Sequence, residues 1–212
     1  MGDDAGLRGI VVVQPPEGMQ PERIKWHLSP NEQAIMKDVS SRPYITVHLY
    51  AGDPERNWFM HMKEAGCKKL VEMIAEAGFN VVLLGATSKR QEDEVIRILD
   101  ETWSYGVGMK AKCGKQTVYN FTGSAHPRLQ SAAVEKAAAT IGTMSAWTTL
   151  GIAYRKPAWI CTIEGIHHHF TKPDMGVFSV AGQYATRVQL DRTSTEEQLA
   201  SVKEFLGKQV KA

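Results

Sequence analysis

Cysteines are scarce in this sequence, and neither sign of charge dominates it. Three cysteines, Cys67, Cys113 and Cys161, occur in 212 residues, and they form no CxxC pair. An odd number leaves one cysteine unpaired, so we expect reduced thiols and a cytoplasmic location. A formal net charge of +2 is too small to favour binding to nucleic acid or to an acidic membrane surface.

Long apolar segments are also missing. The first residues, MGDDAGLRG, lack the apolar region of a signal peptide, and no window approaches the length of a membrane span. Neither GxGxxG nor GxxxxGKS/T follows a strand-like segment, so a conventional dinucleotide site or P-loop is not supported. We therefore expect a soluble protein without a membrane span and without a standard nucleotide-binding loop.

From residue 43 onward, strand-like and helix-like segments alternate. Apolar or β-branched runs at 44–50, 79–85 and 158–163 predict buried strands, with a further short strand near 139–141. Helical spacing follows the first run, and Gly78 stands where a helix C′ glycine belongs. About five such alternations are typical of an α/β protein: a doubly wound, Rossmann-like parallel sheet of about five or six strands with helices on both faces. The polar, lysine-containing stretch 104–116 is expected to be a connection.

Residues 1–42 precede this pattern and are predicted to be an N-terminal extension or remnant, while residues 43–212 form the Rossmann-like domain. The extension would hold a short strand at 9–13, a linker and a helix. Ser29 as N-cap, Pro30 at the first helical position and Glu32 form a capping box for that helix. The last helix of the chain opens in the same way, at Ser194 and Glu197.

The stretch from Gly142 to Trp147 places small residues where a strand passes into a helix. Small residues let a ligand approach the backbone, and the free N–H groups of a helix N-terminus suit an anion. A tight turn without any ligand explains this segment equally well. Ligands of doubly wound sheets bind at the carboxyl ends of the strands, which here means the loops 50–58, 85–94, 122–126, 142–147 and 164–171.

Taken in order, these segments resemble the C-terminal half of a heptosyltransferase-type glycosyltransferase, the lipopolysaccharide family with the GT-B fold (glycosyltransferase family 9-like). The resemblance covers residues 42–208. It rests on YITVHLYAG…RNW, on GFNVVLLGATSKRQEDE, and on the block from Asn120 to Thr162, which begins NFTG and includes RKP near its end. Thr122-Gly123 and Lys156-Pro157 match the two ends of the family's pattern. The resemblance implies a single lobe of GT-B type.

In that family this half binds the nucleoside-diphosphate sugar donor, which is a substrate, and the resemblance implies no cofactor. Arg56 stands where a basic residue reaches the diphosphate, and Glu92 or Glu94 lies near the acidic residue that bonds the ribose. Gly123 and Ser124 would line the base. The donor-binding residues implied position by position are Gly52, Asp53, Arg56, Glu92, Glu94, Gly123, Ser124, Thr143, Met144, Ser145 and Ala146.

The sequence departs from the family at informative positions. Met144 replaces an acidic residue before the small turn, the aligned position of a family histidine is near Thr149, and the usual HPG is His48-Leu49-Tyr50. Either the donor differs or the site has decayed. His48 itself, at a strand end, is more often a satisfied structural histidine than a base.

Residues 1–42 are too few for the second lobe that would carry the acceptor and the catalytic base. Catalytic residues are therefore unassigned, and enzyme activity is left open between a half-enzyme, an excised domain and a binding domain. The leading hypothesis is glycosyl transfer from a nucleoside-diphosphate sugar to an unidentified hydroxyl acceptor. The alternative is a non-catalytic interaction or structural module that keeps the lobe without binding a donor.

The missing lobe suggests a partner, either a second copy of this chain or a separately encoded acceptor-binding protein. Phe59, Trp147 and Phe170 are the apolar candidates for that surface. His167, His168 and His169 could suggest a metal, but adjacent residues on an extended loop point in alternating directions and lack a supporting carboxylate. We expect no metal there, while their place after a central strand leaves ligand contact open.

Overall fold

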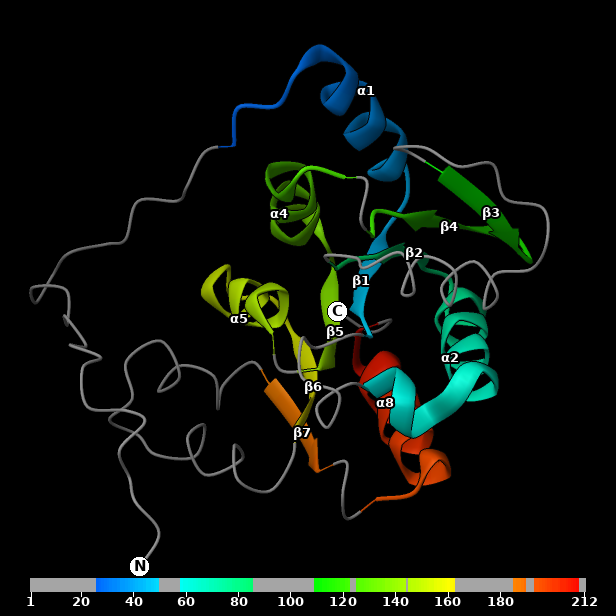
Figure 1. Cartoon of the computed structure of the whole chain (residues 1–212). Helices are drawn as coiled ribbons and strands as arrows, with labels where there is room; N and C mark the ends of the chain where they lie inside the picture. Colours follow the sequence, from blue (N-terminus) through cyan, green and yellow to red (C-terminus); the bar gives the residue numbers. More distant parts are fainter. Residues whose placement is uncertain are drawn as a thin grey trace, which may run out of the picture.

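The structure is a computed structural model that describes residues 26–49, 58–85, 109–122, 125–143, 145–162, 185–189 and 193–209. These residues form one seven-stranded sheet in the order β3-β4-β2-β1-β5-β6-β7, with helices on both faces (Figure 1). The strands are β1 (Tyr44–His48), β2 (Asn80–Leu83), β3 (Met109–Cys113), β4 (Gln116–Asn120), β5 (Ala139–Thr143), β6 (Ala158–Thr162) and β7 (Ala185–Gln189). The helices are α1 (Pro30–Val39), α2 (Trp58–Glu76), α4 (Pro127–Lys136), α5 (Ala146–Ala153) and α8 (Thr195–Gln209).

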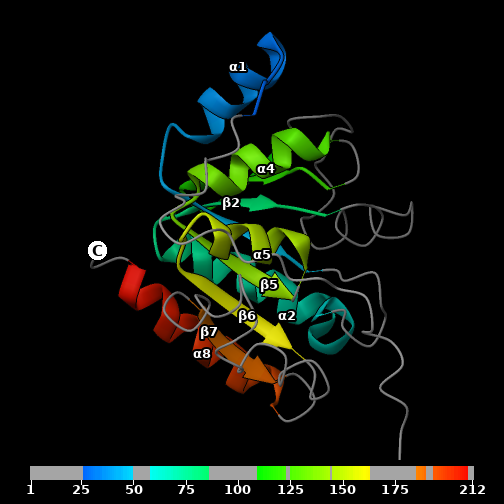
Figure 2. The ribbon, with the colours of Figure 1, turned by 90° about the vertical axis from the view of Figure 1, so that its left-hand side faces the viewer.

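All neighbouring strands of the sheet pair parallel except β3 and β4, which pair antiparallel. Figure 2 shows the arrowheads of β5, β6 and β7 pointing toward the same edge of the sheet. The chain passes from β1 to β2 and β4 on one side, and then returns to β5 on the other side of β1. The predicted doubly wound α/β sheet is thus confirmed. Its order reverses between β1 and β5, which is where such sheets bind ligands.

Strand β3 is a correction to the sequence analysis, because it lies within the stretch 104–116 that was expected to be a connection. It pairs antiparallel with β4 through a tight hairpin in which Gly114 has a φ of 60°. Half-buried Ala111 and Cys113 alternate with exposed Lys110 and Lys112. These lysines hide the strand in a hydropathy pattern, yet charged residues are typical of an edge strand because they discourage pairing with other chains.

Each face of the sheet has its own core and its own helices. Ile45 and Val47 of β1 pack with α2 and α8 in one cluster, whereas Tyr44 packs with α1 and α4 in another. Figure 1 shows α4 and α5 on one side of the strands, and α2 and α8 on the other. Because both faces of the sheet are covered, every residue of β1 and β2 is buried, and no exposed positions alternate with buried ones.

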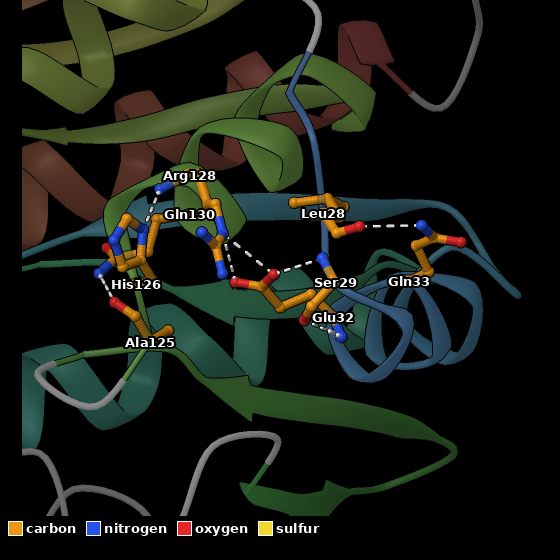
Figure 3. Close-up of polar contacts among 8 residues, drawn as sticks. All are labelled: Leu28, Ser29, Glu32, Gln33, Ala125, His126, Arg128 and Gln130. Atoms are coloured by element: carbon orange, nitrogen blue, oxygen red, sulfur yellow. Dashed lines mark hydrogen bonds and ion pairs between the residues drawn. The ribbon is translucent and has the colours of Figure 1, made fainter.

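Helix α1 is tied to α4 by a shared carboxylate. The predicted capping box is present: the Ser29 N–H donates to Glu32 Oε2 at 2.7 Å, and Ser29 Oγ accepts from the Glu32 N–H at 3.4 Å. The same carboxylate accepts from Arg128 Nε of α4 at 2.9 and 3.0 Å (Figure 3). These hydrogen bonds, led by that of Arg128, lower the pKa of Glu32 to about 2. Met36 and Val39 are buried on this face of the sheet, so the described part of the N-terminal extension packs directly on the domain.

Two helical glycines give a matched test of how closely α5 approaches the sheet. A Cβ on Gly151 of α5 would lie 2.5 Å from Thr140 Cγ2 of β5, whereas a Cβ on Gly207 of α8 would have nothing within 4 Å. We expect Gly151→Ala to lower the free energy of unfolding by about 1–3 kcal/mol through overpacking. Gly207→Ala should instead raise it, by up to about 1 kcal/mol, through helix propensity. Urea unfolding measures both, and equal effects of the two variants would contradict close packing at Gly151.

Candidate functional site

The candidate site lies at the carboxyl edge of the sheet, around the switch point. The segments that meet there follow β1, β2, β4 and β5, and each is short where the structure describes it. His48 ends β1, Leu84 and Gly85 follow β2, and Thr122 follows β4. Beyond β5, Ser145 leads directly into α5. Parallel strands bring these segments to one edge, so the fold itself collects them.

A buried histidine ends β1 at this edge of the sheet. His48 is 5% exposed, and its Nδ1 lies 3.3 Å from Thr143 Oγ1 of the neighbouring strand β5. Burial lowers the pKa of His48 to about 4, because a charged imidazole would lose its hydration. The ring is therefore neutral at pH 7. Its burial and its contact with Thr143 fit the expectation of a structural histidine.

Gly142 allows β5 to lie close to His48. A Cβ at Gly142 would come within 2.2 Å of the His48 carbonyl oxygen, so no larger residue fits without a backbone shift. The Cys161 thiol of β6 donates to the Gly142 carbonyl at 3.4 Å, and burial raises the pKa of that thiol well above its ordinary value. Cys161 is thus an inert structural thiol, as expected of a cysteine inside an apolar strand. Because Gly142 and Thr143 complete β5, the turn begins later than the sequence suggested.

The N-terminus of α5 is capped by its own side chains. Ser145 and Thr148 form a reciprocal box: the Ser145 N–H donates to Thr148 Oγ1 at 2.9 Å, and the Thr148 N–H donates to Ser145 Oγ at 3.4 Å. Thr148 Oγ1 also lies 2.9 Å from the Thr143 carbonyl oxygen, to which its hydroxyl donates. The N–H groups of Ala146 and Trp147 have no acceptor among the described residues. Helix N-terminal N–H groups of this kind can bind an anion.

A buried glutamine of α4 contacts the backbone on the β2 and β4 side of this edge. Gln130 is 2% exposed. Its Oε1 accepts from the Gly85 N–H at 2.9 Å. Its Nε2 donates to the Ala125 carbonyl at 3.0 Å, a contact drawn in Figure 3. Nearby, Asn120 Oδ1 accepts a hydrogen bond from the Thr122 N–H at 3.0 Å and another from the Thr122 hydroxyl. Side-chain amides thus fix the backbone that follows β2 and β4.

The structure describes three of the residues expected to bind the donor. Thr143 is fully buried with its hydroxyl against His48, Ser145 is half-buried as the N-cap, and Ala146 is exposed at the first turn of α5. The other expected contacts lie outside the described residues: Gly52, Asp53, Arg56, Glu92, Glu94, Gly123, Ser124 and Met144. His167, His168, His169 and Phe170 lie outside them too.

The sequence analysis missed Thr148 and Gln130. Thr148 closes a capping box in which threonine replaces the usual Glu or Gln, so the pattern gives a weak signal. Gln130 gave a clearer signal, because it is a polar residue on the core-facing side of an alanine-rich helix. Buried polar side chains are almost always hydrogen-bonded, so that position pointed to a defined partner.

Within the described residues, no three His, Cys, Asp or Glu side chains gather as metal ligands would. The same part of the chain holds no helix with both the length and the apolar character needed to cross a bilayer.

No family model and no curated protein matches this sequence. Among solved structures, the fold is similar to the E. coli ADP-heptose LPS heptosyltransferase II, with a TM-score of 0.55 and 15% identity over 89% of this chain and 56% of that one. It is also similar to the family 9 glycosyl transferase of Veillonella parvula DSM 2008, with a TM-score of 0.57 and 12% identity over 84% of this chain and 51% of that one. The E. coli heptosyltransferase WaaC with ADP gives a TM-score of 0.53 and 14% identity, over 84% and 48%.

This chain spans about half the length of each of these proteins. The identities show the fold alone, and that fold agrees with the resemblance inferred from the motifs. The chain therefore has the α/β fold of one half of a heptosyltransferase-type glycosyltransferase.

The neutral His48 predicts a dependence of stability on pH. Its pKa is about 4 when folded and lies near 6.5 in the unfolded chain, so below pH 6.5 the unfolded state binds the extra proton. This contribution is complete above pH 6.5 and is lost as the pH falls to 4, by on the order of 2–3 kcal/mol. His48→Gln keeps a polar side chain that does not titrate, so urea unfolding should show a smaller loss between pH 7 and pH 4 in the variant. Parallel pH profiles in both proteins would contradict a buried neutral histidine.

Proposed function

We propose that this chain is a donor domain of a glycosyltransferase, which binds a nucleoside-diphosphate sugar for transfer to a hydroxyl acceptor. The observation that carries the proposal is the β5–α5 turn at the switch point. There the N–H groups of Ala146 and Trp147 have no acceptor among the described residues, and Gly142 keeps the strand backbone free of a side chain. Helix N-terminal amides at the carboxyl edge of such a sheet are suited to a diphosphate.

A similar solved structure supports the proposal that this fold binds a nucleotide. The E. coli heptosyltransferase WaaC was solved with ADP, and that protein has the same half-domain architecture over nearly half of its length. The proposed donor is a sugar linked to a nucleoside diphosphate.

In this proposal the chain's own groups act on the leaving group. As the bond from sugar to diphosphate breaks, negative charge grows on the diphosphate. The two amide N–H groups and the positive end of the α5 dipole would stabilise that charge. Arg56, placed by the resemblance, would add a charged donor. The residue that removes the proton from the acceptor would lie outside these donor-binding groups.

A charge placed at the first position of α5 tests the proposal. Ala146 is exposed there, so Ala146→Asp should leave stability unchanged or raise it by about 0.3–1 kcal/mol through the helix dipole. The carboxylate would repel a diphosphate, and we expect ADP affinity to fall at least about tenfold, a loss of about 1.4 kcal/mol. Isothermal titration of ADP measures this, with Ala146→Asn as a control of the same size and no charge. Arg56→Ala should weaken binding in the same way without changing stability.

Two outcomes would overturn the assignment. If Ala146→Asp unfolds the protein, the turn is packing rather than a binding surface. If no nucleotide or nucleotide sugar shifts the melting temperature of the wild type, the donor site is absent. A ligand at one hundred times its Kd adds roughly 2.7 kcal/mol, so such a shift is readily detected. The absence of any shift would favour the non-catalytic interaction module.

A further inference from the structure

The imidazole of His48 is hydrogen-bonded at only one of its two nitrogens. Its Nδ1 lies 3.3 Å from Thr143 Oγ1, whereas its Nε2 has no partner among the described residues, although the residue is only 5% exposed. Buried polar atoms almost always have a partner, because leaving one without costs free energy. This nitrogen lies at the carboxyl edge, where doubly wound sheets bind ligands, so it is placed to meet a ligand atom.

Thr143 decides which ring nitrogen of His48 carries the hydrogen. Thr143 is fully buried, and among the described residues its hydroxyl has one acceptor, the Nδ1 atom of His48. The hydroxyl therefore donates to Nδ1, and the hydrogen of the neutral ring lies on Nε2. Because burial lowers the pKa of His48 to about 4, the ring stays neutral at pH 7. The Nε2–H group is thus an uncharged donor in a fixed orientation.

Gly85 leaves room beside this donor. A Cβ on Gly85 would lie 3.5 Å from both Nε2 and Cδ2 of His48, which is an ordinary contact distance. The next described atom that it would meet, Thr122 Cγ2, is 3.9 Å away. Within the described part of the chain, glycine therefore leaves unfilled a position next to Nε2 that any other side chain would occupy.

Thr143 also connects this donor to the first turn of α5. Its hydroxyl donates to His48, and its carbonyl accepts the Thr148 hydroxyl at 2.9 Å. One residue thus holds both the imidazole and the helix N-terminus, where the N–H groups of Ala146 and Trp147 lack an acceptor in the described segments. All of these groups are hydrogen-bond donors, so they suit the oxygen atoms of an anion.

We propose that His48 is a further ligand-binding residue, whose Nε2–H donates to an oxygen of the diphosphate at the β5–α5 turn. This rests on the proposed function, in which the N-terminus of α5 faces that diphosphate. Thr143 holds the ring in one orientation and one tautomer, so the donor is in place before the ligand binds. A preorganised donor of this kind stabilises the negative charge that grows on the diphosphate as its bond to the sugar breaks.

Two substitutions of His48 separate the roles of its nitrogens. His48→Asn keeps an amide at the level of Nδ1 and has no atom at the level of Nε2, whereas the amide of His48→Gln reaches that level. We expect the affinities for ADP and for inorganic pyrophosphate to fall about tenfold in His48→Asn and to stay within about threefold in His48→Gln. Isothermal titration measures both ligands. Equal affinities in the two variants, or a loss for ADP alone, would overturn the contact with the diphosphate.

His126 provides a matched control for the same substitution. It is the exposed N-cap of α4, and its Nδ1 accepts the Arg128 N–H at 3.2 Å. Asparagine is also a good N-cap, so His126→Asn should leave stability and both affinities unchanged. Urea unfolding checks that each variant is folded at the temperature of the titration. If His126→Asn weakens pyrophosphate as much as His48→Asn does, the effect is not specific to the buried ring and the proposal fails.

Nitrogen-15 NMR of the histidine side chains tests the folded wild type directly. We expect His48 to carry its hydrogen on Nε2 at pH 7, and the Nε2 resonance to shift when ADP or pyrophosphate binds. Thr143→Val should lose this single tautomer, and Thr143→Ser should keep it. A hydrogen on Nδ1 in the wild type would overturn the proposal. If the ligands bind and Nε2 does not respond, the contact alone fails; if neither ligand binds, the proposed function fails and the contact fails with it.

Discussion

The close approach of β5 to β1 at Gly142 and His48 is the contact on which the candidate site depends. The backbone of β5 lies so near the His48 carbonyl that a single methyl group at Gly142 would come within 2.2 Å of it. This contact brings Thr143 Oγ1 to the imidazole and buries the ring in its neutral form. The turn into α5 then starts from a fixed strand end, which is what a preorganised anion site requires.

Helix α5 also packs closely against β5. Gly151 lets the helix sit against Thr140 of β5, and Thr148 ties the first turn of the helix back to the Thr143 carbonyl. The N-terminus of α5 is thus held to β5 at two points. The buried hydroxyls of Thr143 and Thr148 each have a hydrogen-bond partner, which gives this part of the edge one defined geometry.

The first described helix belongs to the helical layer of the sheet. Helix α1 packs on α4 through Glu32 and Arg128, and it buries Met36 and Val39. It completes the helical layer on that face of the sheet.

Local patterns in the sequence determined the elements and the fold class. The capping box at Ser29 and Glu32, the C′ glycine Gly78 with its φ of 94°, and the buried runs of β1 and β2 were all predictable, because caps and periodicity depend on neighbouring residues. Edge strand β3 was not, because its lysines obscure the apolar alternation.

Only the tertiary structure decided which residues meet at the carboxyl edge. His48 and Thr143 are 95 positions apart, and Gln130 lies 45 positions from Gly85. Nothing in a local pattern links them, since strand order brings them together and the sequence does not encode strand order as a periodicity. The sequence determined that a small turn would open a helix; parallel packing of β1 beside β5 decided that a neutral histidine would lie beneath it.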